Sequence, residues 1–132
     1  MKYIVLMQFS AAGAEFPSMD SWTPEEVRAH IEHMHRLNEE LAAAGERVDA
    51  QGLAGPQTAR IVRANGGSPL VTDGPFPETK EFLAGYWIVD VDRPERAHEI
   101  AARASAAPGP GGVPLNMPIE VRQVMSAPPA EV

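Results

Sequence analysis

The stretch Phe82–Val91, FLAGYWIVDV, decides the fold because it predicts a strand with apolar side chains on both faces. Every second residue of an extended chain points to the same side. One face therefore carries Phe82, Tyr86 and Ile88, and the other carries Leu83, Trp87, Val89 and Val91. A strand that is wet on one side alternates apolar and polar residues more cleanly. Both faces of this strand are therefore expected to need a cover.

Two helices are predicted from capping signals and apolar periodicity. Thr23-Pro24-Glu25-Glu26 combines a capping threonine, a proline at the first helical position and an acid where a capping box requires one. This helix is expected to run to about Ala44, with Gly45 as its left-handed cap. A second helix is expected over Pro94–Ser105, capped by Asp92. The apolar stripe of the first helix is formed by Val27, Ile31, Met34, Leu37 and Leu41.

The remaining segments predict strands and one α+β domain. Lys2–Phe9 is expected to be a strand with two apolar faces, and Arg47–Leu53 and Ile119–Met125 are expected to be shorter strands. Residues 58–72 predict a hairpin that turns at Asn65-Gly66-Gly67. The domain is expected to span residues 1–125, with both helices on one face of the sheet. Residues 126–132 are expected to form a flexible tail.

One face of the predicted sheet has no cover within the chain. Two helices suffice for one face of a sheet of about four or five strands. A large apolar side chain gains about 1.5–3 kcal/mol when it is buried, and soluble monomers seldom leave a large apolar patch in water. A second copy that packs sheet against sheet is the simplest cover. The alternative is that the long loops of the chain fold over this face.

The composition argues against several classes of protein. The chain has 132 residues, of which 44% are hydrophobic, as expected for a globular domain. It has no cysteine, which excludes disulfides, zinc–thiolate sites, iron–sulfur clusters and thiol catalysis. A net charge of −7 argues against nucleic acid as a partner. The apolar run Ile4–Met7 is too short for a signal peptide or a membrane helix, so a cytoplasmic protein without membrane contact is expected.

Residues 71–86, VTDGPFPETKEFLAGY, resemble the DGPF motif of the YCII-related family and its E-x-K-E-x-x-x-G-[YF] continuation. The resemblance extends in order along nearly the whole chain and includes Met1-Lys2-Tyr3, Leu41–Gly45, Thr58 with Val62-Arg63, and Glu120–Arg122. It implies a ferredoxin-like βαβ-β-βαβ fold, with an antiparallel sheet and two helices on one face. It also implies a homodimer that forms through the sheets, a dimeric α/β barrel.

The resemblance leaves two functions open. The superfamily includes muconolactone-type isomerases and dehalogenases, which implies a cofactor-independent enzyme with isomerase- or lyase-like acid–base chemistry on a small anionic organic molecule. Some DGPF proteins are encoded beside extracytoplasmic-function sigma factors, which implies a non-catalytic ligand-binding or regulatory dimer. A His–Asp pair proposed for the YCII family does not carry over. The residue before Pro108 is Ala107, and the place of the histidine falls near Met34.

The candidate catalytic residues are Asp73, His30 and His35, which would move a proton. Each has a structural interpretation as well. Asp73 begins an Asp-Gly turn, and a histidine on an apolar helix face is typical of a hydrogen-bonded core residue. His30 and His33 have the spacing of a metal-binding pair, but the sequence offers no third ligand, so no metal is predicted. Phosphate-binding, G-x-S-x-G and dinucleotide motifs are absent from the sequence, so no cofactor is predicted.

The candidate substrate-binding residues are two arginines, a Glu–Lys pair and a tyrosine. Arg63 and Arg122 would hold a carboxylate, and the alternative is an ion pair with Glu120 across strands. Glu78 and Lys80 share one side of an extended chain, and the alternative is a solvated ion pair of little energetic weight. Tyr86 would form the wall of a ligand pocket, or would belong to the core or to the interface between two copies.

Overall fold

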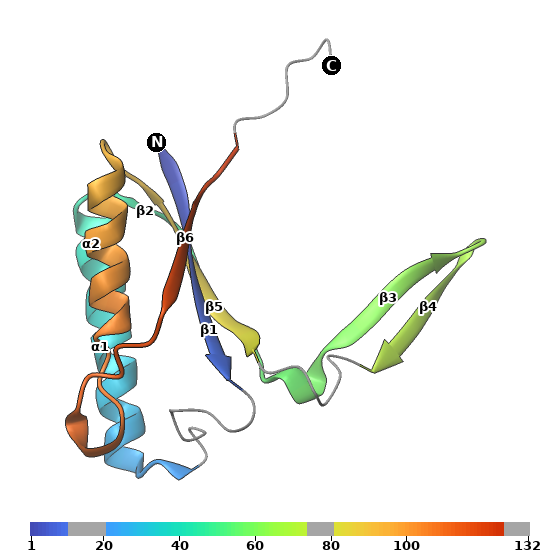
Figure 1. Ribbon diagram of the computed structural model, residues 1–132, viewed down its shortest axis with the longest axis horizontal. Helices are drawn as coiled ribbons and strands as arrows, with labels where there is room; N and C mark the ends of the chain where they lie inside the picture. Colours follow the sequence, from blue (N-terminus) through green and yellow to red (C-terminus); the bar gives the residue numbers. More distant parts are fainter. Residues whose placement is uncertain (11–20, 74–80, 126–132) are drawn as a thin grey trace.

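The structure, a computed structural model, describes residues 1–10, 21–73 and 81–125 (Figure 1). The tail predicted for residues 126–132 lies outside this part of the chain, as do the candidates Glu78 and Lys80. The roles predicted for these residues stay predictions.

The described strands form an antiparallel four-stranded sheet and a separate two-stranded hairpin (Figure 1). The order in the larger sheet is β2-β5-β1-β6, so the long strands β1 and β5 lie in the centre. This order, with two helices on one face, confirms the predicted α+β ferredoxin-like fold. The strands of this sheet are β1 (Lys2–Ser10), β2 (Arg47–Gly52), β5 (Glu81–Asp90) and β6 (Ile119–Gln123).

Helix α1 (Pro24–Ala43) begins with the predicted capping box. The Glu26 backbone N–H donates to the Thr23 hydroxyl at 3.2 Å, and the Thr23 N–H donates to a Glu26 carboxylate oxygen at 2.8 Å. The predicted left-handed cap is also confirmed, since Gly45 has a φ of 72°. Two orphan amides at the helix start are thereby satisfied.

Helix α2 (Pro94–Ser105) lies beside α1 on the same face of the sheet (Figure 1). The predicted cap at Asp92 is wrong. The N-cap residue is Arg93, which makes no capping hydrogen bond through its side chain. Asp92 therefore lies one residue too early to cap this helix.

The core fills the space between the helices and the sheet. Leu37 and Leu41 of α1 are almost completely buried, as are Val5 and Val89 of the central strands. The prediction that Ile31 belongs to the apolar stripe is wrong, because its side chain is 43% exposed. His30 is buried instead, on the helical line that continues through Leu37 and Leu41. The other buried apolar residues are Tyr3, Met7, Trp22, Trp87, Val91, Ala97, Ile100, Ala101, Ala104, Ala107, Leu115 and Met117.

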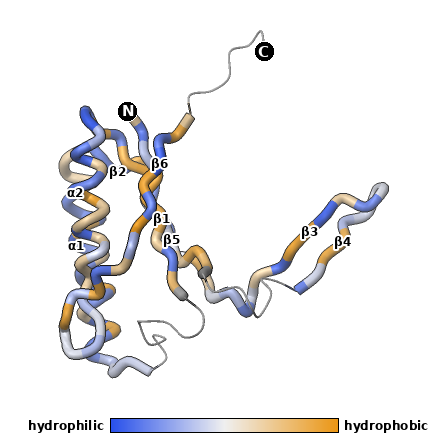
Figure 2. Tube along the Cα trace, in the orientation of Figure 1, coloured by the Kyte–Doolittle hydropathy of each residue, from blue (hydrophilic) through white to orange (hydrophobic). Residues whose placement is uncertain are grey.

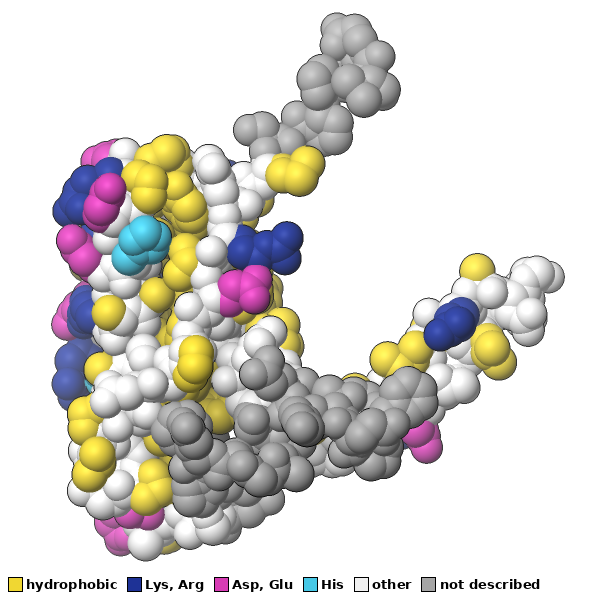
Figure 3. Space-filling model, viewed as in Figure 1, with side chains coloured by type: hydrophobic (Ala, Val, Ile, Leu, Met, Phe, Trp, Pro, Cys, Tyr) yellow, Lys and Arg dark blue, Asp and Glu magenta, His cyan; other side chains and the backbone are white. Residues whose placement is uncertain are grey.

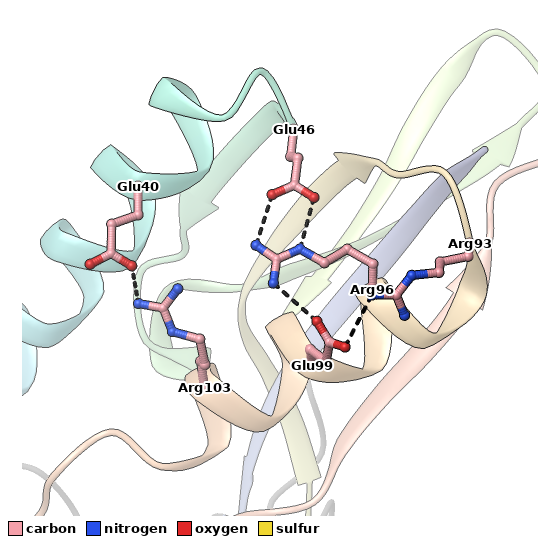
Figure 4. A network of polar contacts seen from close by, with 6 residues as sticks. All are labelled: Glu40, Glu46, Arg93, Arg96, Glu99 and Arg103. Atoms are coloured by element: carbon pink, nitrogen blue, oxygen red, sulfur yellow. Dashed lines mark hydrogen bonds and ion pairs between the residues drawn. The ribbon is translucent and has the colours of Figure 1, made fainter.

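Ion pairs tie α2 to α1 and to the turn that follows α1, on the outside of this core (Figure 4). Arg96 of α2 binds both carboxylate oxygens of Glu46 at 2.8 and 2.9 Å and also contacts Glu99. The Arg96 guanidinium lowers the pKa values of Glu46 and Glu99. Arg103 of α2 binds Glu40 of α1. These charged side chains therefore form ion pairs with one another at the surface of the helix layer.

Gly85 marks a close approach between β5 and its neighbour β2. A Cβ atom at this position would lie 2.9 Å from the carbonyl oxygen of Gln51, which is shorter than real contacts allow. The glycine of the family-like G-[YF] pattern is therefore required here by packing. It directly precedes Tyr86, which faces the other side of the sheet.

The hairpin of β3 (Arg60–Asn65) and β4 (Ser68–Asp73) stands away from the rest of the chain (Figure 1). It turns at Gly66 and Gly67, whose φ values of 56° and 111° are those that a two-residue hairpin turn needs. This confirms the predicted hairpin, although a 3₁₀ turn over Pro56–Thr58 delays its first strand to Arg60. We call residues 60–73 the arm.

The face of the sheet opposite the helices has no described helix or strand over it (Figures 1 and 2). We call it the open face. The side chains of Ile4, Leu6, Tyr86 and Ile88 are half-buried on this face, paired across β1 and β5 by the strand register. The loop 106–118 packs on the other side, where its Leu115 and Met117 join the core. The loop 106–118 therefore does not cover the open face. For the loops that include residues 11–20 and 74–80, which lie outside the described residues, the predicted alternative stays open.

Candidate functional site

A tyrosine and an aspartate form a hydrogen-bonded pair at one edge of the open face. The Tyr86 hydroxyl on β5 donates to Asp49 Oδ2 on β2 at 2.9 Å. The other carboxylate oxygen, Oδ1, accepts hydrogen bonds from the Ala50 amide at 2.9 Å and the Gln51 side-chain amide at 3.2 Å. Both side chains remain partly accessible to solvent. The pair is thus held in place and yet open to a ligand.

The hydrogen bond also sets the charge of the pair. The Tyr86 hydroxyl lowers the pKa of Asp49, and the same bond raises the pKa of Tyr86. At neutral pH the carboxylate is therefore ionised and the phenol is protonated. The phenol proton is committed to Asp49, so the phenol oxygen can only accept a further hydrogen bond. The pair is suited to a hydroxyl or amine group and is unsuited to a bare carboxylate.

The opposite edge of the open face carries a charged pair on β6. By register, Arg122 lies beside Ile4 and Glu120 beside Leu6. Arg122 Nε lies 3.7 Å from a Glu120 carboxylate oxygen, and both side chains are well exposed. An ion pair between Glu120 and an arginine of another strand was expected. Arg122 contacts Glu120 within β6 instead. The open face therefore has an apolar centre between two polar edges.

The arm carries two other sequence candidates. Asp73 ends β4 with its side chain 95% exposed and lies 3.4 Å from Arg60 Nε. Arg63 is exposed on β3, across from Leu70. An exposed ion pair of this kind is worth little and is weakened by salt.

His30, His33 and His35 lie on α1, on the covered side of the sheet. His30 is buried, and its Nδ1 donates to the carbonyl oxygen of Pro108 at 3.1 Å. Its ring also meets Trp22 edge to face, with centroids 5.5 Å apart. Burial lowers the pKa of His30, so the imidazole is neutral at pH 7. His33 Nε2 donates to the carbonyl of Arg103 at 2.7 Å, and His35 is exposed.

Two side chains from the first two turns of α1 hold the loop 106–118. His30 binds the carbonyl of Pro108, and Glu26 Oε2 accepts a hydrogen bond from the Gly111 amide at 2.6 Å. The position where the family's proposed aspartate would precede the proline is the buried Ala107. In this chain His30 contacts the backbone carbonyl of the next residue, Pro108.

One chain does not bring the predicted catalytic residues together. Asp73 lies on the arm, His30 lies on the buried side of α1, and His35 lies on the exposed side of the same helix. Of the predicted substrate-binding residues, Tyr86 and Arg122 lie on the open face and Arg63 lies on the arm. The functional roles of all of these residues stay predictions.

Sequence reasoning missed Asp49. The residue lies in a short strand with a weak apolar pattern, and a single aspartate there gives no signal. Its position depends on the pairing of β2 with β5, which includes an irregularity between Arg47 and Asp49. That irregularity brings Asp49 within reach of a tyrosine 37 residues away. Only the topology of the sheet reveals the pair.

Two further findings concern metals and membranes. In the described residues, no group of three or more histidines and carboxylates is arranged to hold a metal ion. None of the helices in the same residues is both long enough and apolar enough to cross a membrane.

The fold places this chain among the α+β proteins of ferredoxin-like topology. The family model described as the YCII-related domain matches residues 1–113, so the chain is a member of the YCII-related family. It is also similar to an uncharacterised protein, R00369, of Rhizobium meliloti (strain 1021). The two are 29% identical over 87 residues, which is 66% of this chain and 70% of that protein.

Proposed function

We propose that the protein is a homodimer that binds a small organic molecule between its open sheet faces, without transforming it. One observation carries this proposal. The open face places the Tyr86–Asp49 pair at the edge of an apolar surface, whereas the predicted acid–base residues lie elsewhere. His30 is engaged by a backbone carbonyl and Asp73 lies near Arg60. This distribution favours the binding function over the enzyme.

A second copy of the chain is the cover that the open face requires. Ile4, Leu6 and Ile88 form a continuous apolar strip along β1 and β5. These side chains are only half-buried in one chain, although their strands are central to the sheet. Two identical strips meet across a two-fold axis without any further partner. The space between the sheets then becomes the ligand-binding cleft.

The chemistry of the cleft indicates the ligand. Tyr86 and Asp49 accept hydrogen bonds, so they favour a hydroxyl or amine group. The apolar strip favours a hydrocarbon portion, and Arg122 at the other edge is the predicted anchor for an anionic end. The ligand class is therefore a small organic molecule that has an apolar body and at least one hydrogen-bond donor.

The dimer is tested by light scattering on the full chain at micromolar concentration. We expect a mass of two chains for the wild type and one chain for Ile88→Lys, because lysine places a charge in the apolar strip. Ile31→Lys, an identical change at an exposed site on α1, is the matched control and should stay dimeric. Circular dichroism checks that each variant is folded. A monomeric wild type would contradict the proposal.

The ligand class is tested by NMR titration of the dimer with three probes: benzylamine, benzyl alcohol and benzoate. We expect the first two to shift resonances of β2 and β5 more strongly than benzoate does. Asp49→Asn and Tyr86→Phe should remove most of this response. Glu39→Gln is the control, because it removes one charge from an exposed position of α1. An equal or stronger response to benzoate would contradict the assigned chemistry.

The cofactor-independent enzyme is the second candidate, and the Tyr86–Asp49 pair would supply its acid–base groups. A phenol hydrogen-bonded to a carboxylate can hold or move a proton beside a bound substrate. The probe is pyruvate in D₂O, with exchange of its methyl protons followed by NMR. An enzyme of this kind accelerates the exchange in the wild type and loses the acceleration in Asp49→Asn. Exchange no faster than in buffer counts against it.

A further inference from the structure

The arm presents apolar side chains to solvent on both of its strands. Each residue of β3 and β4 is exposed, including Val62 at 59% and Val71 at 53%. In Figure 3, hydrophobic and basic side chains stand together on the arm, clear of the described body. An isolated two-stranded hairpin is only marginally stable in water. A hairpin of this composition therefore needs another surface.

Apolar side chains lie on both faces of the arm, but only one face carries four of them as neighbours. Residues paired across an antiparallel ladder share a face, and the register pairs Val62 with Val71 and Ala64 with Pro69. We call these four residues the clasp face. The ion pair of Arg60 and Asp73 lies on the same side of the arm, at its base. The other face is more polar and carries Ile61, Thr72, Arg63, Leu70, Asn65 and Ser68.

We propose that the clasp face docks on a second copy of this chain, so that each copy of the dimer is held by the arm of the other. The inference rests on the proposed function, because it requires the dimer. In Figure 1 the arm projects on the side of the open face, away from the helices. A copy that covers the open face therefore lies on the side toward which the arm extends.

Symmetry and charge both favour this occupant. Two chains related by a two-fold axis exchange two identical contacts, so one closed assembly covers both open faces and both arms. The described arm contains Arg60, Arg63 and Asp73 in a chain whose net charge is −7. A slightly basic arm is thus attracted to another copy of this acidic chain.

The first test measures the dimer dissociation constant by sedimentation. We expect Val62→Asp to weaken the dimer at least 10-fold, because it places a carboxylate in the clasp face. Thr72→Asp makes the same change of charge on the other face of the arm and should weaken the dimer less than 3-fold. If Val62→Asp and Thr72→Asp both leave the constant unchanged, the proposal is overturned.

The second test observes the arm of the wild-type dimer directly. Dimers are formed from one ¹³C-labelled and one unlabelled copy of the wild type, and isotope-filtered NOEs select contacts between copies. We expect NOEs from the methyl groups of Val62 and Val71 to the other copy. A dimer that Ile88→Lys dissociates, but whose arm methyls show no such NOEs, would overturn the arm contact and leave the proposed function standing. A monomeric wild type would overturn both.

Discussion

The two faces of the sheet are built from the same strands and are used in opposite ways. Val5 and Val89 point toward the helices and are completely buried, whereas Leu6 and Ile88, their chain neighbours, point the other way and stay half-buried. Both faces are comparably apolar in sequence. The difference lies in what covers them, since α1 and α2 pack on one face only (Figure 1). One face therefore stabilises the subunit, and the other remains available for association and binding.

The largest expected effect lies on the covered face. Ile100→Ala removes a fully buried side chain of α2 and should lower the free energy of unfolding by about 2–5 kcal/mol. Leu6→Ala on the open face should cost less than half as much when the chain is monomeric. Urea denaturation of both variants at low concentration measures the contrast. Equal losses would show that the two faces contribute alike to the subunit.

Gly85→Ala tests the close approach of β2 to β5. The added methyl group would meet the Gln51 carbonyl oxygen at 2.9 Å, so the strands must shift. We expect a loss of about 1–3 kcal/mol in the free energy of unfolding, as for other overpacked sites. The Tyr86–Asp49 hydrogen bond should also weaken, which a change in the tyrosine NMR resonances would report. Gly52→Ala, where a Cβ atom has open space, is the control. A Gly85 variant as stable as the wild type would contradict the packing argument.

His30 gives the covered side a pH dependence. Burial lowers the pKa of His30 below its ordinary value of 6.5, so the unfolded chain takes up a proton that the folded chain does not. The associated stability is therefore present above about pH 6.5 and is lost as the pH falls toward the pKa of the folded state. A charge on His33 also lowers the pKa of His30, so His33 is kept unchanged in the variants below.

The measurement is the free energy of unfolding from pH 7.5 to 5, above the range in which carboxylates titrate. His30→Asn retains a donor toward Pro108 and should flatten the profile in this range. His35→Asn, at an exposed position, should leave the profile unchanged. A wild-type profile that is already flat would contradict the assignment.

The smallest effect is expected at the far edge of the open face. Arg122 is well exposed and lies 3.7 Å from Glu120, so Arg122→Gln should change the free energy of unfolding by less than about 0.5 kcal/mol. Its predicted role in holding an anion would appear only in binding, as a weaker NMR response to benzoate. A large loss of stability would show that the residue is structural.

The sequence predicted the elements that depend on local signals. The capping box at Thr23 and the turn at Gly66 depend on neighbouring residues alone, and both are confirmed. Helical spacing also predicted the apolar stripe, but Ile31 is exposed, whereas His30 is buried and hydrogen-bonded, as its structural interpretation predicted. Asp49 became visible only through the pairing of β2 with β5. A site formed by residues far apart in the chain, such as Tyr86 and Asp49, is therefore not predicted by the periodicity of the sequence.

Glu26 links two parts of the chain that are distant in sequence. One carboxylate oxygen closes the first turn of α1 on Thr23, and the other binds the Gly111 amide, 85 residues later. Fraying of this turn therefore releases the loop as well, and loosening of the loop removes a contact from the turn. The start of α1 and the loop 106–118 are thus coupled through the Glu26 side chain. We expect hydrogen exchange to show these two segments opening as a single cooperative unit.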